Sequence, residues 1–124
     1  MNQRILVVDD SPVVRALHAY ILRSAGFETI EAENGFAALE ALAKQRCHVA
    51  VVDVNMPLMD GFTLIRHVRT ETVHRDMPII VVSTEQGAQD KRKGFEAGAN
   101  VYVVKPTEPE KLIAAVRMLL GNLG

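Results

Sequence analysis

Acidic, hydroxyl and amino side chains stand directly after four short apolar runs of this sequence. The residues at these positions are Asp9, Asp10, Asp53, Ser83, Thr84 and Lys105. Three carboxylates within a few ångströms would repel one another until positive charge arrived, and one lysine supplies only part of that charge. A hard divalent cation such as Mg²⁺, which prefers oxygen ligands, would supply the rest. If folding brings these run ends together, the sequence predicts a small metal-binding site.

Phosphoryl transfer is the chemistry that these residue types suit best. A carboxylate can attack phosphorus, and the protein then needs chiefly in-line placement and cations on the developing negative charge. Asp53 is the candidate nucleophile, Lys105 and the metal would neutralise charge, and Ser83 would hydrogen-bond a phosphoryl oxygen. A simpler alternative stays open at this point, in which Asp9 and Asp10 cap a helix and an ion pair with the lysine neutralises Asp53.

Five apolar runs alternate with helix-length segments along the chain. The runs are Ile5–Val8, Phe27–Ile30, Val49–Val52, Pro78–Val82 and Val101–Val104. They are continuous rather than alternating and mostly β-branched, which indicates a parallel sheet covered by helices on both faces. Because ligands of such sheets bind at the carboxyl ends of the strands, we expect the polar residues to converge there.

Helix signals lie between the runs. Ser11 and Pro12 are typical of an N-cap followed by proline at the first helical position. The buried face of that helix is expected to comprise Val14, Leu17 and Ile21. Thr107 and Glu110 have the spacing of a capping box for the last helix.

The segment 85–100 is predicted to be the least well held helix. It contains Gly87, Gly94 and Gly98, and two internal glycines cost about 1 kcal/mol each relative to alanine. Phe95 is its only large apolar anchor. The basic run 91–93 within it is either a solvated face or a docking site for an acidic partner.

Composition limits the classes of function. A net charge of −1 over 124 residues provides no bulk attraction to nucleic acid or membranes. The apolar runs are far shorter than a membrane span, and the N-terminus lacks a signal-peptide core. The single cysteine, Cys47, permits no internal disulfide and is expected to be a small buried hydrophobe. We therefore expect a cytoplasmic protein with one domain over residues 1–124 and no output domain.

Four blocks of the sequence resemble the receiver (CheY-like) domain of bacterial response regulators. They are VVDDSPVVR, VVDVNMPLMDG, PIIVVST and AGANVYVVKP, and the resemblance covers essentially the whole chain. It implies an α/β fold, a single doubly wound (βα)5 flavodoxin-like domain whose five-stranded parallel sheet has the order 2-1-3-4-5. It also implies a phosphoacceptor switch of a two-component phosphorelay.

The resemblance implies a role for each residue of the acidic site. Asp53 would accept the phosphoryl group, and Lys105 would contact it. Asp10 and Asp53 would bind Mg²⁺ through their side chains and Asp9 would bind it through water. Asn55 would bind the metal through its backbone carbonyl.

Further roles fall on the neighbouring strand ends. The backbone amides of Asn55 and Thr84 would contact the phosphoryl group. Ser83 matches the switch hydroxyl of the family and Tyr102 its switch aromatic, which turns inward when Ser83 moves toward the phosphate. The peptide bond between Lys105 and Pro106 would be cis.

One position departs from the family pattern. Receivers generally carry alanine or glycine directly after the switch hydroxyl, and this chain carries Thr84. We hypothesise that the β-branched side chain narrows access to the phosphoryl group and alters phosphodonor access or phosphoryl lifetime. Asn55 and Glu85 also stand where the family tunes the attacking water.

The resemblance names partners by class. A sensor histidine kinase or histidine phosphotransfer protein would donate the phosphoryl group. A downstream effector protein would then bind the face formed by the fourth helix, fifth strand and fifth helix. We expect no direct contact with nucleic acid or membrane, and a monomer, with a phosphorylation-dependent dimer as the open alternative. None of His18, His48, His67 and His74 is expected at the strand-end site; all four should occupy surface or helix-face positions.

Three other classes of function stay open. An aspartyl phosphatase usually carries Asp-x-Asp after the first strand, whereas here the acids are adjacent and no cap segment is present. A flavin or nucleotide carrier would need a phosphate-wrapping first loop, and two carboxylates oppose that ligand. A receiver-like module could bind partners without phosphorylation. Under the leading interpretation the protein is not an enzyme, because it catalyses only its own phosphorylation and dephosphorylation.

Overall fold

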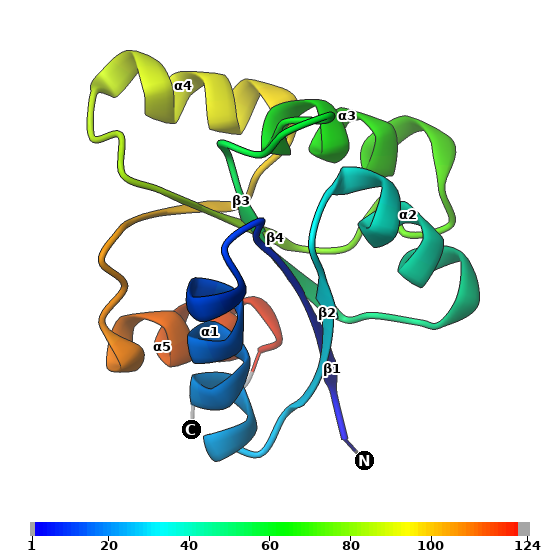
Figure 1. Ribbon diagram of the computed structural model, residues 1–124, viewed down its shortest axis with the longest axis vertical. Coiled ribbons are helices and arrows are strands. Elements are labelled where there is room, and N and C mark those ends of the chain that lie inside the picture. Colours follow the sequence, from blue (N-terminus) through cyan, green and yellow to red (C-terminus); the bar gives the residue numbers. More distant parts are fainter. Residues whose placement is uncertain (1, 122–124) are drawn as a thin grey trace.

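Strands and helices alternate strictly along the computed structural model, which describes residues 2–121 (Figure 1). The strands are β1 (Arg4–Val8), β2 (Glu28–Ala32), β3 (Val49–Asp53), β4 (Ile79–Ser83) and β5 (Val101–Val104). The helices are α1 (Pro12–Ser24), α2 (Gly35–Lys44), α3 (Gly61–Glu71), α4 (Ala88–Ala97) and α5 (Pro109–Leu119). Every predicted strand is confirmed, and no strand end differs from its predicted position by more than two residues. The differences arise because an apolar run does not mark where strand pairing begins.

The five strands form one parallel sheet with the order β2-β1-β3-β4-β5, as the resemblance implied. In its register Val8 of β1 pairs with Val52 of β3, so that the next residues, Asp9 and Asp53, lie side by side at the carboxyl ends of the two strands. Ser83 of β4 pairs in turn with Val104 of β5. This register aligns four strand ends along one edge.

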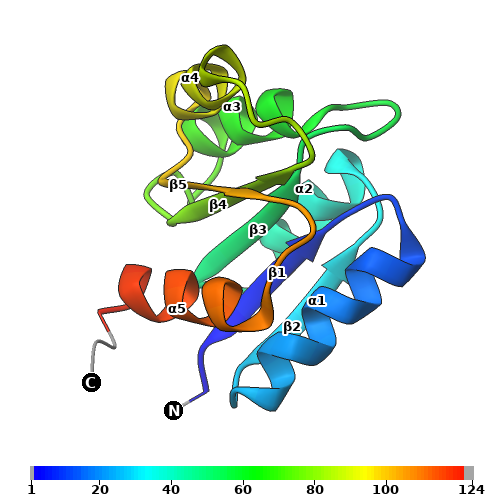
Figure 2. The same ribbon diagram turned by 90° about the vertical axis from the view of Figure 1, so that its left-hand side faces the viewer.

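Helices cover both faces of the sheet. Figures 1 and 2 show α1 and α5 on one face and α2, α3 and α4 on the other. Two apolar cores result: one contains Ile5, Leu22 and Leu112, and the other contains Leu6, Leu64 and Ile79. The central strands are buried on both faces, which is why their sequences are continuous apolar runs.

The predicted buried face of α1 was wrong in one position. Ser11 caps the helix as expected, accepting a hydrogen bond from the Val14 amide at 3.3 Å. Leu17, however, is 51% exposed, and His18 is buried in its place. The apolar stripe that the sequence suggests is therefore rotated by about one residue from the face that packs on the sheet.

The predictions for α4 and α5 need correction. Gly87 is the N-cap of α4 and Gly98 its left-handed C-cap, so only Gly94 is internal, and Phe95 is 50% exposed rather than an anchor. The capping box before α5 does not form: Glu108 is the N-cap, and Pro109 opens the helix. The helix start therefore lies one residue later than the Thr107 pattern predicts.

Two further predictions concerned the burial of Cys47 and of the histidines. Cys47 is buried, as expected. His74 was expected at a surface or helix-face position, but it is buried in the loop that connects α3 to β4, where its Nε2 accepts a hydrogen bond from the Cys47 amide at 3.1 Å. Within residues 2–121, no helix has the length and apolar character to cross a membrane.

Candidate functional site

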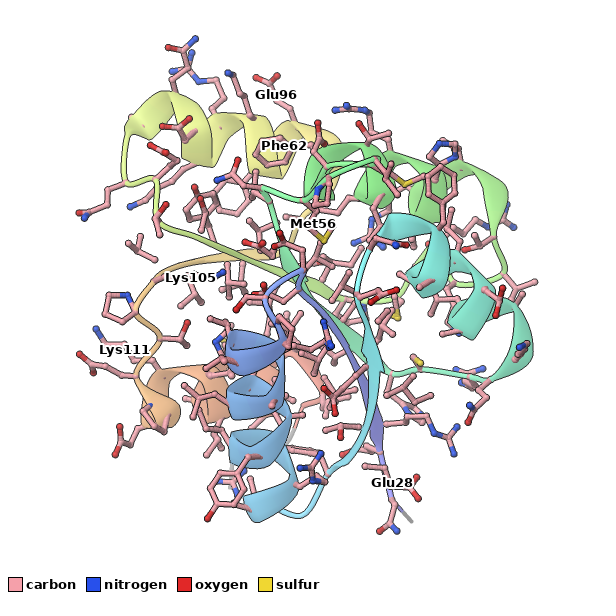
Figure 3. The ribbon with its side chains drawn as sticks, viewed as in Figure 1. Glu28, Met56, Phe62, Glu96, Lys105 and Lys111 are labelled. Atoms are coloured by element: carbon pink, nitrogen blue, oxygen red, sulfur yellow. The ribbon has the colours of Figure 1, made fainter. Side chains whose placement is uncertain are left out.

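Three aspartates and one lysine meet at the carboxyl edge of the sheet. Asp9 and Asp53 are 1% and 5% exposed, whereas Asp10 is exposed, and one oxygen from each lies within 4.8 Å of the others. The Lys105 Nζ donates to Asp9 Oδ2 and to Asp53 Oδ1, both at 3.0 Å. In Figure 3 the Lys105 side chain extends from the end of β5 toward the ends of β1 and β3.

Asp9 is held on every polar side. Its amide donates to the Ala32 carbonyl of β2 at 3.2 Å, and its Oδ1 accepts from the Ser11 amide at 2.9 Å. Asp10 makes no hydrogen bond or ion pair to any residue in the described part of the chain. The simpler alternative is confirmed in part: Asp9 accepts from the amide of Ser11, the N-cap of α1, and Lys105 pairs with Asp53. Asp10 caps no helix among the described residues.

The loop after β3 depends on a close approach that only glycine permits. A Cβ at Gly61 would overlap the Asp53 carbonyl oxygen and lie 2.9 Å from the Val54 Cα. The Gly61 amide instead donates to the Val54 carbonyl at 2.8 Å, and Asp60 caps α3 by accepting from the Thr63 amide. The start of α3 is thereby packed directly against the backbone that carries Asp53.

The charges of the site act on one another through a buried environment. Burial raises the pKa of Asp53, the Lys105 hydrogen bond opposes that rise, and the charges of the other two aspartates add to it. Burial alone would lower the pKa of Lys105, but its bonds to Asp53 and Asp9 prevail and raise it. The lysine therefore stays charged, and burial of Asp53 disfavours the ionised form of its carboxyl group.

Ser83 and Tyr102 are connected through the backbone of Glu85. The buried Ser83 Oγ accepts from the Glu85 amide at 3.0 Å, and the Tyr102 hydroxyl donates to the Glu85 carbonyl at 2.8 Å. Asn55 lines the same hollow as these two side chains. A movement of the Ser83 hydroxyl toward Asp53 would thus break a bond to the residue that holds Tyr102.

The remaining predicted positions lie at the rim. Asn55 and Thr84 are exposed, and their side chains make no hydrogen bond to another described residue. The peptide bond between Lys105 and Pro106 is cis, as the resemblance implied.

Sequence reasoning missed two residues of α1 near the site. Arg15 donates from Nη1 to the Asp9 carbonyl at 2.8 Å. Buried His18 lies close enough to Asp9 and Lys105 for their charges to act on its pKa, which is lowered mainly by burial. The one signal in the sequence is that both residues follow Asp10 by one or two helical turns. Many surface side chains have the same spacing, so this signal does not identify a site residue.

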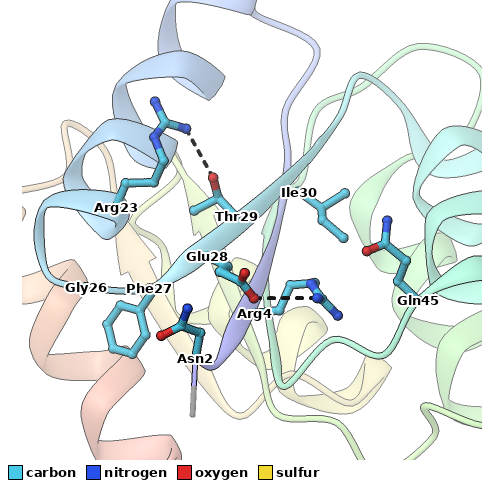
Figure 4. A pocket seen from close by; sticks show the side chains of 9 residues that line it. All are labelled: Asn2, Arg4, Arg23, Gly26, Phe27, Glu28, Thr29, Ile30 and Gln45. Carbon is cyan, nitrogen blue, oxygen red and sulfur yellow. Dashed lines mark hydrogen bonds and ion pairs between the residues drawn. The ribbon is translucent and has the colours of Figure 1, made fainter.

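A separate hollow lies at the amino-terminal ends of β1 and β2, and Figure 4 shows the side chains that line it. There Arg4 bonds to Glu28 at 3.5 Å, and Arg23 bonds to Thr29 at 3.1 Å. Because these groups satisfy one another and lie at the opposite end of the strands from Asp53, we assign this hollow no part in the chemistry.

Comparisons with known proteins agree with this geometry. A family model, the response regulator receiver domain, matches residues 5–117. The chemotaxis protein CheY homolog of Campylobacter jejuni is 39% identical over 121 residues, 96% of this chain and 93% of that protein. The chain spans only 52–54% of the length of other curated relatives, which are transcriptional regulatory proteins.

Solved structures give the same result. Chemotaxis protein CheY4 of Vibrio cholerae has a TM-score of 0.91 and 34% identity, covering 96% of this chain and 99% of that chain. The receiver domain of sensor histidine kinase PA1611 from Pseudomonas aeruginosa has a TM-score of 0.89 and 28% identity, covering 98% and 99%; its structure has a magnesium ion coordinated in the active site cleft. With its sequence matched over residues 5–117 and its fold shared with these proteins, the chain belongs to the response regulator receiver domain family.

Proposed function

We propose that this chain is a phosphoacceptor switch, which takes a phosphoryl group from a histidine kinase or histidine phosphotransfer protein onto Asp53. The observation that carries the proposal is the pairing at the carboxyl edge: Lys105 Nζ lies 3.0 Å from Asp53 Oδ1, beside the carboxylates of Asp9 and Asp10. A cation fixed beside a nucleophilic carboxylate, with further carboxylate oxygens that could hold a second cation, suits phosphoryl transfer.

The transfer forms one bond and breaks another. Asp53 Oδ2 makes no hydrogen bond to a described residue, so its lone pair can attack phosphorus while Oδ1 stays on Lys105. The P–N bond of the donor phosphohistidine breaks, and the imidazole leaves with the electron pair. Lys105 neutralises charge on the phosphoryl oxygens, and the Ser83 hydroxyl is free to rotate toward them if it gives up the Glu85 amide.

The acidic cluster fits Mg²⁺. Its ligand atoms are all carboxylate oxygens, and three carboxylates against one ammonium leave two negative charges, the charge that a divalent cation would balance. Asp10 and Asp53 would hold the ion through their side chains, Asn55 through its carbonyl, and Asp9 through water. When bound, Mg²⁺ supplies positive charge to the transferring phosphoryl group.

The output would be a change of conformation. Phosphorylation adds charge that attracts Ser83 and Lys105, and the bonds through Glu85 connect Ser83 to Tyr102. The face of α4, β5 and α5 would then change and bind an effector protein. Under this proposal the chain acts in the cytoplasm, does not bind nucleic acid or membrane directly, and catalyses only its own modification.

The test is incubation with Mg²⁺ and a small-molecule phosphodonor, followed by intact mass measurement. We expect one added phosphoryl group, which is absent in Asp53→Asn and when Mg²⁺ is chelated. Asp60→Asn is a matched control, because Asp60 caps α3 near the site without joining the acidic cluster. No adduct with any donor, in a protein that binds Mg²⁺, would contradict the proposal.

A further inference from the structure

Arg15 is fixed between the first strand end and the edge of the sheet. Its side chain is only 17% exposed although it lies on α1 beside the site. Its Nη1 donates to the backbone carbonyl of Asp9 at 2.8 Å, and its Nε lies 3.4 Å from Glu31 Oε1 on β2. One guanidinium thus joins a helix, a strand and the turn that carries two acidic residues.

The carbonyl that Arg15 holds determines the direction of the next residue. The Asp9 carbonyl belongs to the planar peptide unit that ends at the Asp10 Cα. The amide and both carboxylate oxygens of Asp9 are held by Ala32, Ser11 and Lys105, and the bond from Arg15 holds its carbonyl. Asp10 itself is exposed and makes no bond to any residue between 2 and 121. The bond from Arg15 fixes the peptide before Asp10, and the bond from the Ser11 amide to Asp9 fixes the peptide after it, so that the two contacts together set the direction of the Asp10 side chain.

We propose that Arg15 is a positioning residue, which orients Asp10 toward the acidic cluster and so strengthens divalent cation binding. This inference rests on the proposed function, because it concerns the cation that the same site would hold. Arg15 does not touch the cation in this assignment; it acts through the Asp9 to Asp10 peptide.

Charge and positioning predict opposite effects, which makes the inference testable. If Arg15 acted only through its charge, its removal would make the site more negative and tighten cation binding. If it positions Asp10, its removal should weaken binding. Glu31 partly neutralises the guanidinium, so a single substitution would also leave that carboxylate without its partner. The double variant Arg15→Gln/Glu31→Gln keeps the net charge and isolates the positioning effect.

The experiment is a titration of the full chain with Mg²⁺ alone, without phosphodonor, followed by ¹H–¹⁵N NMR. Replacing a residue that orients a metal ligand typically weakens metal affinity by about ten- to a hundredfold, and we expect a Kd increase near the lower end of that range in the double variant. Arg15→Lys should recover part of the loss, since an ammonium can donate to the Asp9 carbonyl but lacks the planar guanidinium that reaches Asp9 and Glu31 through two different nitrogens.

Arg23→Gln is the matched control. Arg23 lies on the same helix and bonds to Thr29 of the same strand at 3.1 Å, but at the other end of the sheet (Figure 4). It should leave the Kd for Mg²⁺ unchanged. Urea unfolding of each variant checks that all are folded, and Arg15→Lys tests the inference even if the double variant does not fold.

The outcomes separate the two proposals. If the unmodified chain shows no Mg²⁺-dependent shifts, the proposed function fails and this inference fails with it. If the unmodified chain binds Mg²⁺ and the double variant and Arg15→Lys bind it equally or more tightly, the proposed function stands and the positioning role of Arg15 is rejected.

Discussion

At the scale of single residues, the three aspartates of the acidic cluster differ in how many hydrogen bonds their carboxylates accept. Both side-chain oxygens of Asp9 accept hydrogen bonds and one oxygen of the Asp53 side chain does, whereas the Asp10 carboxylate accepts none within the described chain. These differences could not be read from the residue types, since all three are aspartates. Under the proposed function, the Asp9 carboxylate is part of the framework, the Asp53 carboxylate reacts, and the Asp10 carboxylate is available to a cation.

Thr84 is the residue at which the site is expected to behave unlike the family pattern. Its exposed β-branched side chain stands directly after buried Ser83. Removing it in Thr84→Ala should open the approach of water or donor and shorten the phosphoryl lifetime. Steric effects of about 1 kcal/mol correspond to a change of less than about tenfold. Intact mass measured over time after donor removal provides the rates, and equal rates in the two proteins would reject the hypothesis.

His74 should make stability depend on pH. Burial lowers its pKa below the ordinary 6.5, with the charges of Arg46 and His48 acting in the same direction. A group whose folded pKa is lowered contributes stability that is present above its unfolded pKa and lost as pH falls below it. The free energy of unfolding should therefore fall below pH 6.5.

The matched variant is His74→Gln, whose side-chain oxygen can accept from the Cys47 amide but does not titrate. Urea unfolding at about pH 7.5 and about pH 5.5 should show a smaller loss in the variant. Part of the loss should persist, because the pKa of buried His18 is lowered as well. An identical loss in both proteins would show that His74 is not responsible.

At the scale of elements, glycines decide how closely helices approach the site. Gly61 opens α3 against the backbone of Asp53, whereas Gly94 faces the ring of Tyr102 from within α4. The two contacts differ in kind, because a backbone atom cannot move aside as a side chain can.

Alanine at these two positions should therefore have different effects. In Gly61→Ala the new Cβ overlaps backbone, and overpacking of this kind costs roughly 1–3 kcal/mol. In Gly94→Ala the Cβ meets Tyr102 Cδ2 at 3.2 Å, and a helix-propensity gain of about 1 kcal/mol offsets the displacement of the ring. Urea unfolding measures both; a Gly61→Ala protein as stable as the unmodified chain would contradict the close approach.

At the scale of the whole molecule, one edge of the sheet concentrates negative charge that the fold alone does not balance. Binding of a cation to the folded state should therefore raise stability by mass action. At a Mg²⁺ concentration of about 100 times Kd, the free energy of unfolding should rise by about 2.7 kcal/mol.

The measurement compares urea midpoints in chelator and in excess Mg²⁺. Asp10→Asn should lose most of the increment, because Asp10 is the carboxylate with no partner in residues 2–121. Glu33→Gln, at an exposed acidic position outside the cluster, should keep it. A full increment in Asp10→Asn would place the cation elsewhere.

The sequence by itself determined the elements and the chemistry at their ends. Continuous β-branched runs of four or five residues indicate strands of a covered parallel sheet. The residues that directly follow these runs are Asp9, Asp53, Ser83 and Lys105. Strand type and polar endings depend on local composition, which is why these predictions held to within two residues. The starts of α4 and α5 were less accurate, because Gly87 and Thr107 each fit more than one capping position.

Only the tertiary structure decided which groups meet. The register of β1 on β3 sets Asp9 level with Asp53, and α1 brings Arg15 and His18 toward the same edge although nothing in their spacing required it. Lys105 and Asp9 are 96 residues apart in the sequence, yet they form a hydrogen bond in the folded chain. Such long-range bonds determine which carboxylate is held and which is free. Such contacts follow from packing between elements, which no local pattern of residues records.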